Sequence, residues 1–321
     1  MKQQRHRCRK KPTGKLQQCL KMLNPIVDVN VAIALGSNKT VAKETQCKRR
    51  NFAENVFRTL HQLGYKITDP KKLGNRLLVV LTQHWVDEDL APSTFQNNMM
   101  NLRMLAKWIG KSGMVDLMDI RHIPPEKLRR TYKATRNKDW SEDDDFAETI
   151  QEIYNHDNFV GVQLMLMQAF GLRAQEAMKL RVNVADQGTY LNVFWGVKGG
   201  RKRTIEILSP TQRDVLEFAK KHIAPGSAHN STIPREYKFH QWRNRFYYII
   251  RCHGVTVKNL KVAHGLRHGF AQRMFRFKTG EEARIRTNKK LEQSEKVEIG
   301  KIQTSETLGH SRTSLLSVYG C

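Results

Sequence analysis

The sequence of 321 residues has few of the features that mark membrane, secreted or metal-binding proteins. It has no apolar run long enough to span a bilayer, so no transmembrane helix and no membrane partner are expected. No apolar segment follows its basic N-terminus, which argues against a secretory signal. The 5 cysteines are widely spaced and form no Cys-x-x-Cys pair, so neither a disulfide framework nor a zinc site is predicted. Reduced thiols in a cytoplasm are the plain expectation.

Acidic residues are also scarce. The chain has 30 Asp and Glu against 56 Lys and Arg, which gives a formal net charge of +26 spread along its length. A compact domain with this surplus repels itself unless a polyanion neutralises it. Double-stranded DNA is therefore the expected partner, bound with a strong dependence on salt. A merely soluble basic protein, or one that sits on an acidic surface, is the alternative.

The first third of the chain predicts a basic arm followed by helices. Residues 1–40 lack steady periodicity, and the first 11 contain 6 Lys or Arg and no acid. Such an arm either lies along phosphates or is a disordered tail. Residues 41–115 predict a helical bundle. On its third helix Met99, Leu102, Leu105 and Ile109 would face inward, whereas the outer face is either solvated or contacts DNA through Arg103 and Lys107.

Residues 116–139 predict a linker, because Pro124-Pro125 blocks helix formation. Arg129 and Arg130 belong to a basic run that either crosses a DNA backbone or is an ordinary hinge. Residues 140–321 predict a mainly α domain with a small antiparallel β-sheet, an α+β arrangement. Its apolar segment 159–170 should be a buried helix. Residues 190–195 and 203–207 alternate as strands, joined by a basic, glycine-rich hairpin with Lys198, Arg201 and Lys202.

Four short segments contain the candidate catalytic residues. They are Gly-Leu-Arg173-Ala-Gln-Glu, Lys198 on the hairpin, His264-Gly-Leu-Arg267-His-Gly-Phe-Ala, and Leu-Gly-His310 with the later Tyr319. Each has an ordinary structural explanation: an Arg–Glu pair on a helix, a lysine in a loop, a core histidine beside a surface arginine, or a tyrosine near a chain end. Their combination and order carry more information than any one of them.

Together these segments resemble the signature of the tyrosine recombinases, also called the phage integrase family. The resemblance implies a helical core-DNA-binding domain over 41–115 and a catalytic domain over 140–321, closing as a C-shaped clamp on duplex DNA. It implies a site-specific recombinase that integrates or excises a mobile genetic element. A type IB topoisomerase-like enzyme that relaxes DNA, and a catalytically inactive DNA-binding relative, are the alternatives.

The resemblance also implies how the strand is cut. Tyr319 would attack phosphorus in line and form a 3′-phosphotyrosyl intermediate, and Lys198 would protonate the leaving 5′-oxygen. No metal is expected because protein cations take its place. No ATP or other cofactor is expected, because the phosphotyrosyl bond keeps the energy of the phosphodiester.

The remaining residues of the signature would act on the phosphate. Arg173 and Arg267 would hold its non-bridging oxygens and stabilise the charge that develops in the transition state. His264 would help to remove the tyrosine proton or bond the phosphate, and His310 would donate to the phosphate.

Two features depart from the family pattern. Arg267 and His310 are 43 residues apart, and the extra stretch, about 278–302, is highly charged. We expect a solvated insertion, an exposed helical hairpin or a loop, that contacts DNA or a neighbouring protomer. Only Gly320 and Cys321 follow Tyr319 in this sequence, so contacts between protomers are expected to come from elsewhere than a C-terminal helix. The expected assembly is a homo-tetramer on DNA, cytoplasmic and nucleoid-associated, with accessory DNA-bending or directionality proteins.

Overall fold

A computed structural model describes residues 12, 14–34, 39–129, 131–223, 230–289, 291 and 294–321 of the chain. The chain divides into two compact units, Met1–Thr131 and Tyr132–Cys321. Each unit has its own hydrophobic core and is considered by itself. In the described residues, no helix is both long and apolar enough to cross a membrane.

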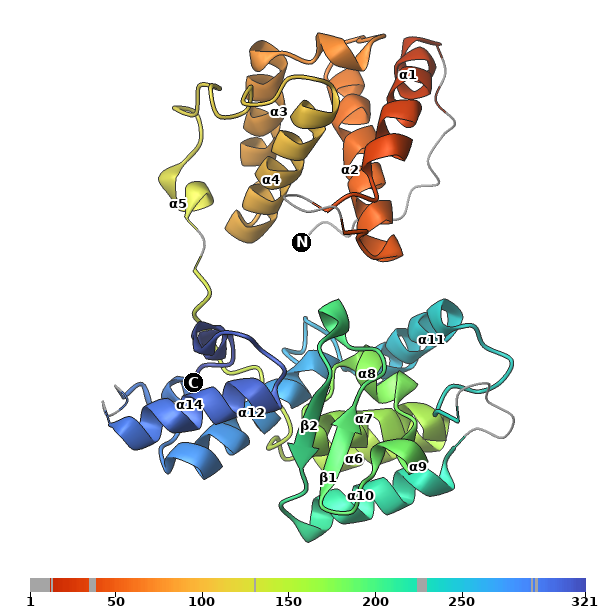
Figure 1. Ribbon diagram of the computed structural model, residues 1–321, viewed down its shortest axis with the longest axis vertical. Helices are drawn as coiled ribbons and strands as arrows, with labels where there is room; N and C mark the ends of the chain where they lie inside the picture. Colours follow the sequence, from red (N-terminus) through yellow and green to blue (C-terminus); the bar gives the residue numbers. More distant parts are fainter. Residues whose placement is uncertain are drawn as a thin grey trace. The chain divides into compact units, whose positions relative to one another are not determined.

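The first unit is a bundle of helices (Figure 1). They are α1 (Gly14–Asn30), α2 (Lys43–Gln62), α3 (Asn75–Asp87), α4 (Pro92–Trp108) and the short α5 (Pro125–Leu128), with a 3-10 turn at Pro70–Lys72. Apolar residues three and four positions apart give each long helix one buried stripe, which packs into a shared core. The predicted inner face of α4 is confirmed, because Met99, Leu102, Leu105 and Ile109 are all buried.

The basic arm predicted over 1–40 is wrong for part of its length. Gly14–Asn30 is α1, and Cys19, Leu20, Leu23 and Val27 on this helix are buried in the core of the first unit. Their spacing is helical, but Pro25 and the interspersed Lys and Gln residues obscure it. The first 11 residues of the arm, and Arg130, lie outside the described residues.

The linker predicted over 116–139 is also more packed than expected. Met118 and Ile123 are buried in the first core. From Tyr132 onward the segment belongs to the second unit, where the Ala134 amide donates to the Ser317 carbonyl at 2.8 Å.

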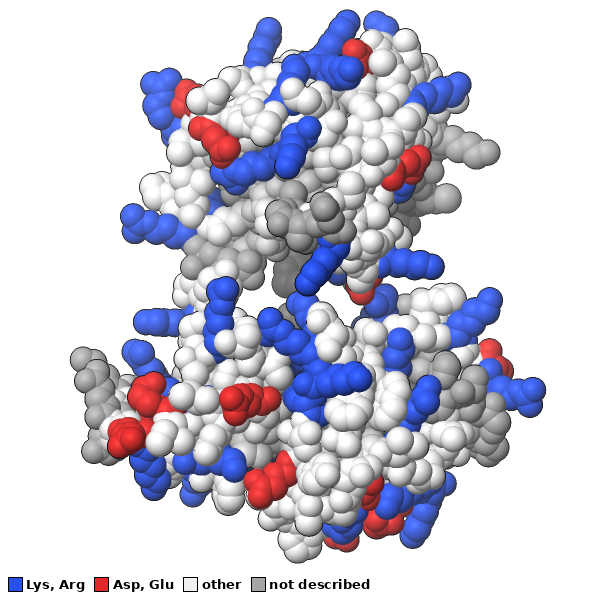
Figure 2. Space-filling model, in the orientation of Figure 1, with Lys and Arg blue, Asp and Glu red and all other residues white. Residues whose placement is uncertain are grey.

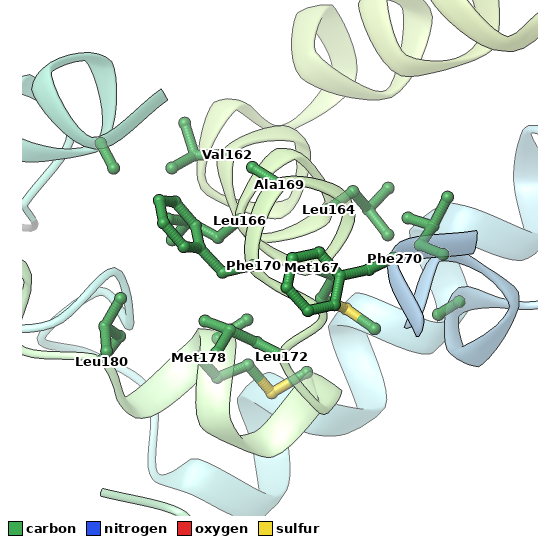
Figure 3. Close-up of a cluster of buried hydrophobic side chains, with 14 of the residues drawn as sticks. Val162, Leu164, Leu166, Met167, Ala169, Phe170, Leu172, Met178, Leu180 and Phe270 are labelled. Carbon is green, nitrogen blue, oxygen red and sulfur yellow. The ribbon is translucent and has the colours of Figure 1, made fainter. Parts of the chain in front are cut away.

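The second unit is mainly helical, as predicted, and is built around α7 (Asn158–Phe170). Helices α6 (Phe146–His156), α10 (Pro210–Lys221) and α12 (Ala263–Thr279) pack against it. Figure 3 shows the apolar side chains of α7 meeting Leu172, Met178 and Phe270 in the core. The other helices are α8 (Ala174–Lys179), α9 (Val182–Ala185), α11 (Phe239–Cys252), α13 (Arg284–Thr287) and α14 (Glu295–Thr307), followed by a 3-10 turn, η3 (Thr313–Val318).

The small antiparallel sheet is confirmed. Strand β1 (Tyr190–Val193) pairs with β2 (Arg203–Glu206) in the register Leu191 to Ile205. Alternate side chains face the core, as expected for a sheet with one buried face. The hairpin between the strands contains a short 3-10 turn at Lys198–Gly200, where Gly199 and Gly200 adopt left-handed φ values of 67° and 72° that favour glycine.

The charged stretch predicted as a solvated insertion is only partly solvated. Helix α12 extends to Thr279, and α14 begins at Glu295 and packs along α12. Ala283 and Val297 are buried. The stretch therefore contributes to the folded unit and is not a separate helical hairpin.

Candidate active site

A glycine turn at the end of α7 places Arg173 at the start of α8. Gly171 has a left-handed φ of 59°, and a Cβ there would lie 2.2 Å from Cδ1 of Phe270. Glycine thus ends α7 and lets α12 approach it closely. Arg173 then caps α8, with its backbone N–H donating to Glu176 at 2.8 Å and its guanidinium donating to the same carboxylate at 2.6 Å.

The carboxylate of Glu176 is shared by two guanidiniums. The side chain of Arg203 on β2 donates to it through both terminal nitrogens, at 3.0 and 2.8 Å. Although burial would raise the pKa of Glu176, the bonds and charges of Arg203 and Arg173 lower it to about 2. Glu176 is fully buried, so its carboxylate holds the guanidinium of Arg173 in a fixed position.

Arg267 on α12 is fully buried and connects three segments. Its Nε donates to the Tyr319 hydroxyl at 3.1 Å, and its terminal nitrogens donate to the carbonyls of Gly171 and Leu308. Burial lowers its pKa to about 10, so the guanidinium stays charged at neutral pH. Residues far apart in the sequence are thereby held around one cation.

Tyr319 follows η3 and is 4% exposed. Nε2 of His310 lies 3.0 Å from the tyrosine hydroxyl, so the hydroxyl can donate to this nitrogen while it accepts from Arg267. His264 contacts Tyr319 only ring to ring, with centroids 6.3 Å apart. His310, not His264, is thus at hydrogen-bond distance from the hydroxyl.

The histidines around Tyr319 are held neutral. Desolvation, then the charges of Arg267 and Arg173, lower the pKa of His310 to about 4. The same two effects lower the pKa of His264, but this residue is exposed, which limits the desolvation of its ring. A neutral His310 offers a lone pair at neutral pH and can accept the proton of Tyr319.

Lys198 is not brought to Tyr319. It lies exposed on the hairpin, and in the part of the chain that the structure describes it makes no hydrogen bond or ion pair. Arg201 and Lys202, on the same hairpin, line a cavity of about 850 Å³ together with His310. Figure 2 draws one face of the second unit, and Lys and Arg side chains gather near its middle.

The other DNA-contact candidates lie in the first unit, at its surface. Arg103 is paired with Asp116 at 2.6 Å, whereas Lys107 is exposed one turn further along α4. Arg129 is exposed directly after α5. Arg130 lies outside the described residues.

Three residues at the site were missed in the sequence. His268 is buried with its ring 4.8 Å from that of Tyr319, and Gln272 donates to the backbone carbonyl of Tyr319 at 3.0 Å. Both follow His264 at helical i,i+4 spacing on α12, so a helical projection of this segment could have found them. The third, Arg203, occupies an inward position of β2 beside apolar neighbours, which is the signal of a buried, paired charge.

His268 should make stability depend on pH. Burial lowers its pKa from 6.5 to about 3, so between these values the unfolded chain binds a proton that the folded chain does not. Stability is therefore lost as pH falls below about 6.5. We expect the wild type to lose about 2 kcal/mol more than His268→Phe between pH 7 and pH 5. Urea unfolding curves of both proteins at the two pH values measure this, and equal losses would contradict it.

Comparisons with known proteins agree with this architecture. The chain matches the family model described as Integrase over residues 129–273 and the model described as Phage integrase, N-terminal over residues 15–115. The first match includes Arg173, Lys198, His264 and Arg267, and the second begins within α1. No curated protein matches the chain.

Several solved structures share the fold. A lambda integrase dimer bound to a COC′ core site is 14% identical, with a TM-score of 0.58 over 97% of this chain and 82% of that chain. A lambda integrase tetramer bound to a Holliday junction is 13% identical, with a TM-score of 0.55 over 94% and 77%. The Tn1549 transposon integrase in complex with transposon right end DNA is 12% identical, with a TM-score of 0.54 over 96% and 95%.

Proposed function

Because this chain belongs to the tyrosine recombinase family of site-specific DNA recombinases, we propose that Tyr319 cuts and rejoins DNA strands through a covalent 3′-phosphotyrosyl bond. One observation carries this proposal. Arg267 Nε and His310 Nε2, from segments far apart in the sequence, both lie within 3.1 Å of the Tyr319 hydroxyl. A buried phenol between a fixed cation and a neutral imidazole is arranged to lose its proton and attack.

The reaction follows from these contacts. His310 Nε2 accepts the hydroxyl proton as the phenolic oxygen bonds to phosphorus and the bond to the 5′-oxygen breaks. Arg267 and Arg173 stabilise the charge on the non-bridging oxygens, and Lys198 gives the leaving oxygen its proton. In the reverse direction a 5′-hydroxyl attacks the phosphotyrosine and releases Tyr319, so the energy of the phosphodiester is conserved.

DNA must move Tyr319 before this chemistry can begin. Arg267 uses three of the five N–H groups of its guanidinium on Tyr319, Gly171 and Leu308. The remaining N–H groups are covered, since the side chain is fully buried. A scissile phosphate that displaces the phenol would accept from the Nε donor that the tyrosine now occupies, and would leave the phenolic oxygen in position for attack.

The biological substrate follows from the relatives and the charge. We propose that the protein binds duplex DNA through the basic face of its second unit and through Arg103, Lys107 and Arg129 of its first unit, and that it integrates or excises a mobile genetic element. The transposon integrase and the lambda integrase complexes support this proposal. The tetramer on a Holliday junction supports a homo-tetramer on DNA. We further propose that accessory DNA-bending or directionality proteins join this assembly and that it is nucleoid-associated.

The covalent step can be tested directly. The genomic flanks of the element supply candidate DNA sites with inverted repeats. A duplex of such a site with a nick next to the scissile phosphate loses a short strand on cleavage, so the covalent complex accumulates. We expect a protein–DNA adduct on denaturing gels and, after nuclease digestion, a nucleotide attached to the peptide that contains Tyr319. An adduct on another residue, or none on any flanking site, would refute the mechanism.

The role of Lys198 predicts a rescue. Lys198→Ala should slow cleavage of an ordinary strand about 100- to 1,000-fold, because a general acid contributes on this scale. A substrate with sulfur in place of the bridging 5′-oxygen has a leaving group that needs no proton. Single-turnover cleavage of this substrate should then be equal in the wild type and in Lys198→Ala. If the sulfur substrate does not remove the difference, Lys198 is not the acid.

A further inference from the structure

The stretch that lengthens the chain between Arg267 and His310 contacts the segment that carries Tyr319. The backbone N–H of Ile285, in α13, donates to the carbonyl of Gly320 at 3.0 Å. Gly320 has a left-handed φ of 83°, and a Cβ there would lie 2.3 Å from Cβ of Ile285. The backbone at Gly320 therefore lies so close to Ile285 that only glycine fits at position 320.

A second connection runs from α13 to Tyr319 through a buried amide. Nε of Arg286 donates to the oxygen of Gln272 at 2.7 Å. The nitrogen of Gln272 donates to the Tyr319 carbonyl and to the oxygen of Asn137, both at 3.0 Å. Because its oxygen faces a donor and its nitrogen faces two acceptors, the amide has a single satisfied orientation. Gln272 is 1% exposed, so losing a partner leaves a buried polar atom unpaired.

Arg286 is itself held in place. It donates to Asp139 at 2.9 Å and to both oxygens of Glu142 at 2.6 and 3.1 Å. The Asp139 side chain is buried, and its other oxygen accepts from the backbone and hydroxyl of Ser141. The guanidinium therefore presents its Nε to Gln272 from a fixed position.

We propose that α13 is a clamp that positions the nucleophile within its own protomer, with Arg286 as a positioning residue that acts through Gln272. The clamp holds the backbone carbonyls of Tyr319 and Gly320 and does not contact the hydroxyl through these bonds. The phenol can then pivot between Arg267 and an incoming phosphate while its backbone stays in place. This inference rests on the proposed function of Tyr319 and gives the lengthened stretch a role within its own chain.

The test compares two arginines of the same short helix. Arg286→Ala removes the clamp, whereas Arg284→Ala removes an exposed side chain that makes no hydrogen bond or ion pair in the described part of the chain. With the nicked substrate we expect Arg286→Ala to form the adduct 10- to 100-fold more slowly, with DNA affinity within twofold of wild type. Arg284→Ala should match the wild type in both. A wild-type adduct rate in folded Arg286→Ala would overturn the proposal.

A second readout needs no DNA. Cys321 follows Gly320 and is partly buried, and burial raises the pKa of its thiol to about 12, which slows its reaction with thiol reagents. Release of the clamp should make Cys321 react at least fivefold faster with a maleimide, measured by peptide mass spectrometry against the exposed Cys252 as reference. Unchanged labelling of Cys321 in Arg286→Ala would overturn the proposal that α13 holds the backbone next to Tyr319. A wild type that labels as expected but forms no adduct would overturn the proposed function alone.

Arg286→Lys keeps the test decisive if Arg286→Ala does not fold. The lysine retains a positive charge beside Asp139 and Glu142 but cannot present separate nitrogens to both carboxylates and to Gln272. The rate of adduct formation should be lower than in the wild type, but by less than the 10- to 100-fold expected for Arg286→Ala. The rate of Cys321 labelling should rise above that of the wild type, but by less than the fivefold expected for Arg286→Ala. A lysine variant equal to the wild type in both measurements would show that the Arg286–Gln272 bond does not position Tyr319.

Discussion

Tyr319→Phe should form no covalent adduct with nicked DNA, a fall of at least about 10,000-fold, because the attacking oxygen is absent. The ring remains, and so does its packing against His268. The lost hydroxyl leaves Arg267 Nε and His310 Nε2 without this partner, which costs on the order of 1–2 kcal/mol of stability. DNA affinity should stay within a few-fold, since the removed group carries no charge.

The control for this prediction is another tyrosine of the same unit. Tyr248 lies on α11 and is 58% exposed, so Tyr248→Phe should retain the wild-type adduct rate. Both variants are compared in single-turnover reactions and in binding titrations at one salt concentration, because affinity for DNA varies steeply with salt. An adduct with Tyr319→Phe would show that another residue is the nucleophile. A loss of binding that equals the loss of cleavage would point to a role in binding.

The sequence predicted several of the residues that the structure places at this site, but not how they pair. Arg173, Arg267, His310 and Tyr319 were found because the types and order of residues in short segments are informative without coordinates. Which histidine meets the phenol depends on the path of the chain after α14. That path places His310 at 3.0 Å from the hydroxyl and leaves His264 in ring contact only.

Local patterns succeeded where one face of an element is uniformly apolar. The inner face of α4 was predicted for this reason, as were the strands of the β-hairpin. The segment that became α7 was predicted as a buried helix because it is apolar along most of its length. Helix α1 was missed because its buried stripe is interrupted by polar residues and Pro25. Burial of this helix depends on partners in α2 and α4 that a local pattern does not contain.

The contacts of Gln272 and of Arg286 in the lengthened stretch were beyond prediction for a different reason. Gln272 bonds to Asn137 and to Tyr319, and Arg286 bonds to Asp139, across sequence separations of 135, 47 and 147 residues. No periodic pattern in the sequence identifies hydrogen-bonded pairs that are so far apart. The high density of charge in the stretch indicated that it is exposed to solvent. Its Arg286, however, is paired with Asp139 and Glu142 in the folded unit.

Glu176→Gln should be the most destabilising conservative change in the second unit. The variant keeps the shape of the side chain but removes the negative charge that Arg203 and Arg173 share. Arg203 is 4% exposed, so its cation would be left buried with a neutral amide. Breaking a buried ion pair from one side costs about 3–5 kcal/mol. We expect a loss of this size in the free energy of unfolding, measured by urea denaturation at pH 7.

A surface carboxylate provides the matched control. Glu217 on α10 pairs with Lys220 and Arg213, and its side chain is 51% exposed. Glu217→Gln should change the free energy of unfolding by less than about 1 kcal/mol, because solvent screens exposed pairs. If the two variants lose equal stability, the buried carboxylate does not hold the arginines as the structure indicates.

The same variant should impair cleavage through Arg173. Glu176 accepts from both the backbone and the guanidinium of Arg173, so its carboxylate fixes where that cation points. With the amide, one acceptor oxygen becomes a donor that faces a guanidinium. We therefore expect adduct formation to fall at least 100-fold at a temperature where the variant is folded. Replacing Arg203 by Met in the Glu176→Gln background should recover part of the stability, since the unpaired cation is removed, but not the cleavage rate, since Arg173 remains unfixed. Recovery of both together would mean that Glu176 serves the fold alone.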